Sequence, residues 1–337
     1  MRLCVGTSKG IVILDPSRRG APVAISAEPP SIWCMAQDSG DPNVIYAGAT
    51  EFADNRRGRG RNSLARSNDG GRTWVDISAN LGADEGVWSL AAAPGAPGEL
   101  FAGTSHARIF RGTSHGRSFH ECTAFAKMPG REHWSFPPPP HIPHVRSISF
   151  DPNDPMTMYA GVEEGGVFRS RDRGESFESL NKGIYTDIHR VAADPRNSRR
   201  LYATTGGGFY LSENAGEAWR HITDGLSRQY TVPLIAGAGT GEAVYTAAAD
   251  GPPPSWSRGS AGADALFFRS DDHGHSFTAM ALDGVSARGM VMQFRGDPDN
   301  GGFFGVMNDG TVIHASGADL TVIADKLPPA YDLVAIP

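Results

Sequence analysis

Histidine and carboxylate side chains that could carry acid–base chemistry are concentrated around one proline-rich stretch of the chain. Four prolines at 137–140 are followed by His141 and His144, and Glu163 lies a short way downstream. An imidazole titrates near neutral pH, and a carboxylate beside it provides the second group that acid–base catalysis often uses. The residues predicted to take part in catalysis are His141, His144, His189 and Glu163.

The same side chains allow a second interpretation, in which they bind a divalent metal ion. Imidazole nitrogens and carboxylate oxygens are common ligands of such ions. The H-x-x-H spacing of the first two histidines sets no geometry, because irregular backbone does not hold both side chains on one face. Without a metal, one of the histidines would act as a general acid or base. The predicted ligands are His141, His144 and His106, with His189 and Glu163 or Glu164 as further candidates.

A third group of side chains could hold a substrate. Indole rings stack on ring-shaped ligands, and arginine binds carboxylate or phosphate groups through its planar fork of N–H donors. In the alternative interpretation, Trp33 and Trp88 plug a central channel of the fold. Arg146 would then form a structural ion pair with Glu163 or Glu164. The residues predicted to bind substrate are Arg146, Trp33, Trp88, Trp134, Trp256 and Arg61.

The overall composition narrows the class of protein. The 337 residues carry a formal net charge of −6, which does not favour general nucleic-acid binding, because that function needs a basic face. Three cysteines are too few and too scattered for a disulfide framework. The N-terminal segment lacks the apolar stretch of a signal peptide, and no segment has the length and apolarity of a membrane span. The expectation is a soluble, cytoplasmic protein.

A repeated unit organises the whole chain. Each copy has a short apolar strand, a turn that often contains Asp-Pro, a strand ending in Tyr-Ala or Phe-Ala, a third strand, and a last strand with an aromatic residue. The tightest spacings between copies are about 41 to 44 residues, which is the period of a four-stranded propeller blade. The innermost strands are predicted near residues 32, 87, 145, 189, 232, 290 and 332.

Seven innermost strands predict an all-β fold, namely a single seven-bladed β-propeller domain over residues 1–337 with four-stranded antiparallel blades. The first blade is incomplete, because 3–7 reads as its second strand and 10–14 as its third. Residues 331–336 are predicted to supply the missing innermost strand. Joining the two ends of the chain in one sheet closes the ring and removes an exposed sheet edge.

The pattern S-x-D-x-G-x-[ST]-[FW] recurs between the predicted third and fourth strands. It is complete at 67–74, 170–177 and 270–277, and it is degenerate at 112–119 and 212–219. Its Asp can accept hydrogen bonds from the backbone of its own turn, its Gly allows a left-handed conformation, and its aromatic residue can pack between sheets. Five copies at blade spacing are a strong repeat signal.

These motifs resemble the Asp-box, or BNR-repeat, propellers of the sialidase-like superfamily over nearly the whole chain. That group includes sialidases, xyloglucan-cleaving glycosidases, sortilin-type receptors and photosystem II assembly factors. The resemblance implies that the Asp of each box is structural and remote from catalysis. Sialidases also carry an early Phe-or-Tyr-Arg-Ile-Pro motif, which this sequence lacks. Sialidase activity is therefore not expected.

The surplus length of the chain indicates which face of the propeller is functional. The loops at 49–63, 120–144 and 249–265 all belong to fourth-to-first or second-to-third connections, which share one face. Arg61 lies in the first loop, whose RRGRGR sequence either attracts an anion or is simply solvated. Trp256 lies in the third. Aligning the blades places four residues at equivalent positions of successive innermost strands, where they should cluster at the channel mouth: Trp33, Trp88, Arg146 and His189.

Two classes of function fit these observations. The first is a hydrolase or lyase that acts on a small or sugar-like substrate, neutral or anionic, through His and carboxylate groups, with or without a metal ion. The second is a non-catalytic propeller that binds a ligand or a protein partner on the same face. Glycosidic chemistry usually needs two carboxylates. The carboxylates expected on the long-loop face are Glu51, Asp54, Glu132, Glu163, Glu164, Asp187 and Asp250, and their spacing does not single out a pair.

Overall fold

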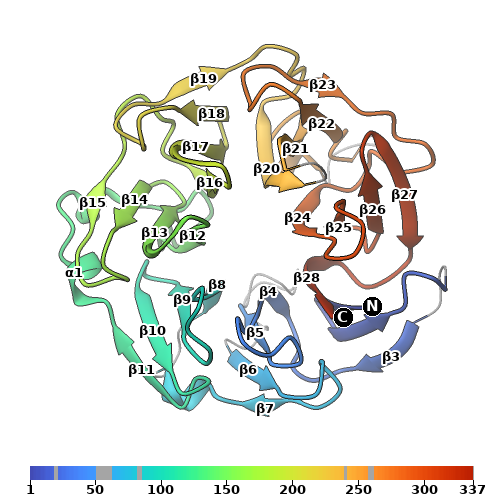
Figure 1. Cartoon of the computed structure of the whole chain (residues 1–337), viewed down its shortest axis with the longest axis horizontal. Coiled ribbons are helices and arrows are strands. Elements are labelled where there is room, and N and C mark those ends of the chain that lie inside the picture. The colour runs from blue at the N-terminus through green and yellow to red at the C-terminus, as the bar shows by residue number, and fades with distance from the viewer. Residues whose placement is uncertain (19–21, 51–62, 82–85, 239–240, 257–261, 337) are drawn as a thin grey trace.

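The computed structural model describes all residues except 19–21, 51–62, 82–85, 239–240, 257–261 and 337. It shows seven four-stranded antiparallel sheets arranged as blades around a central axis (Figure 1). The predicted fold, including the number of blades, is confirmed. No helix among the described residues is long and apolar enough to cross a membrane.

The strands follow one order in every blade, from the channel outward. The innermost strands are β4 (Ile32–Gln37), β8 (Val87–Ala92), β12 (Val145–Asp151), β16 (Ile188–Asp194), β20 (Tyr230–Ala238), β24 (Val291–Gly296) and β28 (Ala330–Ile336). The second strands are β1 (Arg2–Thr7), β5 (Ile45–Ala49), β9 (Leu100–Thr104), β13 (Asp154–Val162), β17 (Asn197–Thr205), β21 (Ala243–Ala249) and β25 (Phe303–Met307).

The third strands are β2 (Gly10–Leu14), β6 (Ser63–Ser67), β10 (Ile109–Thr113), β14 (Gly166–Ser170), β18 (Gly208–Ser212), β22 (Leu266–Ser270) and β26 (Val312–Ser316). The outermost strands are β3 (Pro22–Ser26), β7 (Val75–Asp76), β11 (Ser118–Glu121), β15 (Glu178–Ser179), β19 (Arg220–Ile222), β23 (Thr278–Ala279) and β27 (Asp319–Ala324). Short helical turns occur at α1 (Thr123–Ala126), α2 (Pro253–Trp256), Ser78–Asn80 and Arg131–His133.

The two ends of the chain share one blade, as predicted. β28 pairs antiparallel with β1, and Leu3 lies opposite Ala335. The sheet order β28-β1-β2-β3 places the N-terminal and C-terminal strands side by side (Figure 1). Because this blade contains both ends, the ring cannot open without breaking strand pairing within a sheet.

Close contact between neighbouring blades explains the Tyr-Ala-Gly and Phe-Ala-Gly sequences of the second strands. A Cβ added at Gly48 would lie 2.6 Å from Val87 of the next blade, and one added at Gly103 would lie 2.7 Å from Val145. Both valines are completely buried, and burying such a side chain contributes about 1.5–3 kcal/mol. These two glycines therefore allow Val87 and Val145, the first core residues of the following blades, to pack closely.

The Asp boxes are structural turns, as expected. In the first box, Thr73 Oγ1 donates to Asp69 Oδ2 at 2.6 Å and the Gly71 N–H donates to Ser67 Oγ at 2.8 Å. The degenerate box at 212–219 keeps this arrangement, because the Ala218 N–H donates to Asn214 Oδ1 at 3.0 Å. An amide oxygen thus replaces the carboxylate without loss of the turn.

Candidate functional site in the central channel

A β-bulge near the start of the innermost strands directs side chains into the central channel. The pairing register shifts at Trp33, Trp88, Arg146 and His189, which are the four positions aligned from the sequence. The same shift occurs at Met292 in β24 and at Tyr331 in β28. A bulge adds one residue on one strand and re-aims its side chain. The equivalence predicted from the repeats is confirmed, and it extends to two further blades.

Contacts between bulge residues of different blades show that these side chains face one another. The rings of Trp33 and Tyr331 are stacked with centroids 4.8 Å apart, and the centroids of Trp33 and Trp88 are 5.1 Å apart. The guanidinium carbon of Arg146 lies 4.8 Å from the Trp33 ring centroid. Trp88 is buried, and Trp33 is half-buried. Both indoles therefore form part of the channel wall, and Trp33 retains some exposed surface.

A buried group of polar side chains lies beside this wall. Glu163 follows β13, and Asp187 directly precedes β16, which contains His189. One ligand atom from each of these three residues lies within 4.8 Å of the other two. Glu163, Asp187 and His189 are 7%, 9% and 2% exposed, so all three are shielded from bulk water. We call them the carboxyl–histidine group.

Glu163 is ionised because its neighbours stabilise the charged form. His144 Nε2 donates to Glu163 Oε2 at 2.9 Å, and Arg146 Nε lies 3.5 Å from the same oxygen. Burial alone would raise the pKa of Glu163, but the interaction and hydrogen bond with His144, together with His189 and Arg146, outweigh burial and lower the pKa to about 2. The alternative prediction for Arg146, an ion pair with Glu163, is observed.

Asp187, in contrast to Glu163, is protonated near neutral pH. Burial, together with the charges of Glu163 and Glu164, raises the pKa of Asp187 to about 8. Its Oδ1 is buried and accepts no hydrogen bond from the described residues, and it lies 3.6 Å from His189 Nε2. The group therefore contains one ionised and one protonated carboxyl near neutral pH.

The two buried histidines are neutral. Burial lowers the pKa of His189 to about 4 and also lowers the pKa of His144. His189 Nδ1 donates to the Thr231 carbonyl at 2.5 Å, so its Nε2 carries the lone pair that faces Asp187. In His144 the proton lies on Nε2, where it is donated to Glu163.

Several residues predicted from the sequence lie outside this group. His141 and His106 are exposed, and His141 Nδ1 is bonded to the Phe136 carbonyl at 2.8 Å. Trp134 packs in a blade core beside Phe125 and Phe168. His106 lies in the connection between β9 and β10, whereas Trp134 and His141 lie in the connection between β11 and β12.

Two predicted substrate-binding residues remain, Trp256 and Arg61, and the structure describes only the first of them. Trp256 is half-buried in α2 and packs with the cluster of Met292 and Tyr331, while its Nε1 donates to the Gly251 carbonyl at 2.7 Å. Arg61 lies outside the described residues. Trp256 is therefore placed beside the channel wall, and the prediction for Arg61 remains a prediction.

The metal ligands predicted from the sequence need correction. The described residues contain one group of at least three His, Cys, Asp or Glu side chains that could hold a metal ion, and it is Glu163, Asp187 and His189. It includes none of the three predicted ligands His141, His144 and His106: His141 and His106 are exposed, and His144 is buried with its Nε2 bonded to Glu163. The H-x-x-H spacing was misleading because irregular backbone separates the two imidazoles.

Sequence reasoning missed the importance of Asp187 and of the bulge residues Met292 and Tyr331. Asp187 was one of seven carboxylates expected on the same face, and nothing in its spacing singled it out. Met292 and Tyr331 could have been found by extending the blade alignment to the last two innermost strands. Each of these bulge residues follows a fully buried aliphatic residue, which is Val291 before Met292 and Ala330 before Tyr331.

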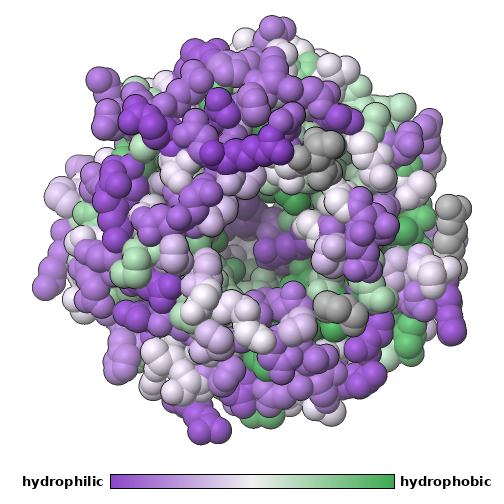
Figure 2. Space-filling model, viewed as in Figure 1, coloured by the Kyte–Doolittle hydropathy of each residue, from purple (hydrophilic) through white to green (hydrophobic). Residues whose placement is uncertain are grey.

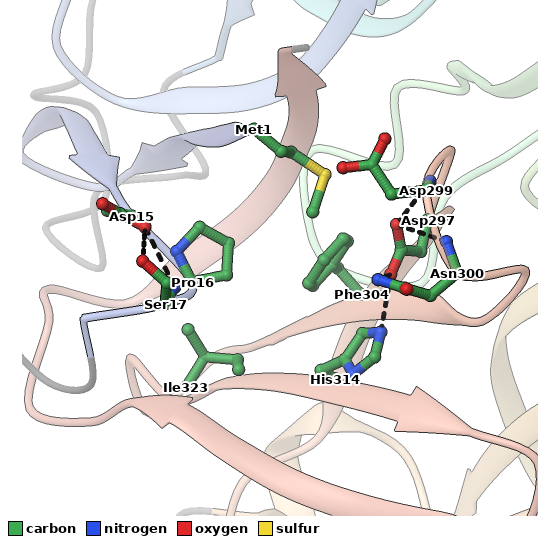
Figure 3. Close-up of a pocket in the computed structure, with 10 residues that line it drawn as sticks. All are labelled: Met1, Asp15, Pro16, Ser17, Asp297, Asp299, Asn300, Phe304, His314 and Ile323. Carbon is green, nitrogen blue, oxygen red and sulfur yellow. Dashed lines mark hydrogen bonds and ion pairs between the residues drawn. The ribbon is translucent and has the colours of Figure 1, made fainter.

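The channel is open as a hollow at the centre of the ring, with hydrophilic residues inside it (Figure 2). A separate cavity of about 350 Å³ lies between the first and last blades (Figure 3). Its wall includes Asp15, Ser17, Asp297 and His314. Asp15 accepts a hydrogen bond from Ser17, and Asp297 accepts one from His314 at 2.8 Å. None of the site residues predicted from the sequence lines this cavity.

Comparison with known proteins supports the architecture. No protein-family model matches the sequence. The chain is 26% identical over 259 residues to a xyloglucanase of Hypocrea jecorina, a match that covers 75% of this chain and 27% of that enzyme. The similarity to glycoside hydrolases is distant. The chain spans only about a quarter of the length of that relative, so the relative's activity is not transferred to it.

Solved structures show the same fold. The GH74 xyloglucanase from Xanthomonas campestris matches with a TM-score of 0.64 at 17% identity, over 94% of this chain and 49% of that one. YCF48 bound to D1 peptide matches with a TM-score of 0.61 at 15% identity, over 93% of this chain and 88% of that one. At these identities the likeness concerns the fold alone.

Proposed function

We propose that the chain is a hydrolase or lyase that acts on a small or sugar-like substrate in the central channel. The observation that carries the proposal is the opposite displacement of two neighbouring carboxyl pKa values, to about 2 for Glu163 and about 8 for Asp187. A pair of this kind supplies one carboxylate and one proton donor at neutral pH, which is how paired carboxyls divide acid and base roles. The distant similarity to a xyloglucanase favours a glycosidic bond.

For hydrolysis of a glycosidic bond, Asp187 is the general acid. It donates its proton to the leaving oxygen as the bond to the anomeric carbon breaks. Glu163 faces the positive charge that develops on that carbon and stabilises it or bonds to it. Water then adds to the carbon and returns a proton to Asp187. Arg146, which lies over the Trp33 ring, is beside Glu163.

The separation of the two carboxyls bears on the stereochemistry of such a reaction. Their nearest ligand atoms are within 4.8 Å. Enzymes that invert the anomeric centre hold their carboxyls about 6.5–9.5 Å apart to admit a water, whereas retaining enzymes hold them about 5–5.5 Å apart. These ranges describe the separation of whole carboxyl groups, so the configuration of the first-formed anomer, read by NMR, decides between retention and inversion.

The test is turnover of a panel of aryl glycosides and xyloglucan oligosaccharides. Asp187→Asn and Glu163→Gln are each expected to lower kcat/KM by about 10²–10⁴-fold. Glu132→Gln is the matched control, because the Glu132 side chain is 72% exposed and lies outside the carboxyl–histidine group. Equal rates for all four proteins would eliminate the assignment.

A divalent metal ion is the competing occupant of the same three side chains. The hydrogen bond from His189 Nδ1 to Thr231 leaves Nε2 available as a ligand, and a backbone carbonyl is a usual partner for a metal-binding imidazole. With a metal bound, the chemistry would be activation of a water for hydrolysis. Arg146, 3.5 Å from Glu163, opposes a cation there, so we propose metal-free acid–base chemistry as the primary function.

The second candidate is a binding propeller without catalysis. It is favoured by the low exposure of the carboxyl–histidine group and by the size match to YCF48 bound to D1 peptide, 88% of which this chain covers. Binding of saccharides or peptides with no turnover, and with unchanged affinity in Asp187→Asn, would support this function over the first.

A further inference from the structure

A second layer of polar residues lies in the channel, one position beyond the bulges. Arg190 follows His189 in β16, Gln293 follows Met292 in β24, and Asp332 follows Tyr331 in β28. They come from three different blades. The Arg190 side chain connects two of these strands, because its Nε donates to Gln293 Oε1 at 2.9 Å.

The acidic member of this layer is already paired. Asp332 accepts hydrogen bonds from Arg295 Nε at 2.9 Å and Nη2 at 2.7 Å, and it also accepts the Met35 N–H at 2.8 Å. It is 1% exposed. Arg295 and Asp332 therefore balance each other and join β24, β28 and β4.

Arg190 has no such partner. Its Nε and Nη1 donate to neutral oxygens, those of the Gln293 amide and the Arg146 carbonyl. Within the described part of the chain, no carboxylate oxygen approaches its guanidinium to 4.0 Å. Its Nη2 makes no hydrogen bond there. A cation held inside a protein with its charge unbalanced is costly, so native proteins pair such charges.

Arg146 adds further donors beside Arg190. Its Nε faces Glu163, while its two Nη groups make no hydrogen bond with described residues. Its backbone carbonyl accepts from Arg190, so the two residues are in direct contact. A guanidinium edge presents parallel N–H groups that match the two oxygens of a carboxylate or phosphate.

We propose that the channel binds a small anion, or the carboxylate or phosphate group of a larger ligand, at the guanidinium of Arg190 with Arg146 beside it. The anion supplies the charge that the channel lacks. This inference adds to the proposed function, because it requires the substrate to carry an anionic group. It rests on the proposed function only in taking the bound ligand to be the substrate. Binding itself is measured without turnover.

The test compares ligands of similar shape that differ in charge. Sodium glucuronate, glucose and inorganic phosphate are titrated into the full chain at constant ionic strength by calorimetry and by thermal unfolding. Glucuronate, phosphate or both are expected to bind saturably and raise Tm, whereas glucose should do neither or bind far more weakly. Tighter binding of glucuronate would indicate a sugar acid as the ligand, and tighter binding of phosphate would indicate a phosphate group.

The variants locate the site. Arg190→Gln is expected to weaken anion binding by roughly ten- to a hundredfold, because hydrogen bonds to a charged group are lost. Arg190→Lys keeps the charge without the fork and should bind with intermediate affinity, and it serves if the first variant folds poorly. Arg171→Gln, which changes a 63% exposed arginine, should bind like the unmodified protein.

Two outcomes would overturn the proposal. One is that neither anion binds more tightly than glucose. The other is that Arg190→Gln or Arg190→Lys, folded by circular dichroism, binds anions with unchanged affinity. Failure of the catalytic proposal is distinguishable, because Asp187→Asn should lose turnover and keep anion binding.

Discussion

The indole of Trp88 lies nearly parallel to the imidazole of His144, with ring centroids 3.5 Å apart and an interplanar angle of 16°. This stack holds the imidazole so that its Nε2 meets Glu163. Trp88, which was predicted from the sequence to bind substrate, therefore positions the His144 imidazole.

His144→Ala is expected to destabilise the protein by about 3–5 kcal/mol, because it removes a fully buried ring and leaves the Glu163 carboxylate with fewer partners. The measurement is denaturant unfolding monitored by tryptophan fluorescence. His141→Ala is the control and should change the free energy of unfolding by less than about 0.5 kcal/mol, since His141 is exposed. Similar effects of both substitutions would contradict the assigned role of His144.

Activity is expected to fall as the pH rises through about 8, because Asp187 then loses the proton that it donates. The stability of the protein should change in the same direction. The folded-state pKa of Asp187 lies above its unfolded value of 3.8, so its contribution is complete below pH 3.8 and is lost as the pH rises toward 8. Unfolding free energies between pH 5 and pH 9 should therefore decline less in Asp187→Asn. A steeper decline in that variant would be inconsistent with a raised pKa.

Asp272→Ala is expected to cost about 1–2 kcal/mol without loss of ligand binding, because the carboxylate accepts hydrogen bonds from Ser270 and Ser276 within its own turn. Burial alone would raise the pKa of Asp272, but these bonds lower it to about 2. Its contribution is present above the unfolded pKa of 3.8 and is lost as the pH falls through 2. Asp271→Ala in the same turn, which removes an exposed ion pair, should cost less than about 1 kcal/mol. Loss of activity in Asp272→Ala with normal stability would show that the box has a catalytic role.

Elemental analysis of the purified protein is expected to find no stoichiometric divalent metal, because Arg146 repels a cation and Asp187 holds a proton. The protein should be measured before and after incubation with zinc and dialysis. One equivalent of metal that is retained by His141→Ala and lost by Asp187→Asn would overturn the acid–base proposal in favour of metal-assisted hydrolysis.

The blade count, the ring closure and the structural role of the boxes could be read from the sequence. They rest on local patterns that recur at a fixed period: the Asp of each box acts within its own turn, and the bulge positions of Trp33, Trp88, Arg146 and His189 are equivalent by alignment. Features of this kind can be predicted without knowing which residues face one another across the channel. The pattern could not show that His141 turns outward, because no local rule sets the path of an irregular loop.

Only the tertiary structure decided which polar residues act together. Glu163, Asp187 and His189 come from two neighbouring blades, and Arg190 reaches β24, which is two blades away. Their pKa values and pairing depend on burial and on charges far away in the sequence. The sequence offered Asp187 as one of seven carboxylates on the same face. The fold places it beside Glu163 and buries both side chains, which distinguishes it from the others. Electrostatic energy depends on distance and solvation in three dimensions, which sequence spacing does not encode.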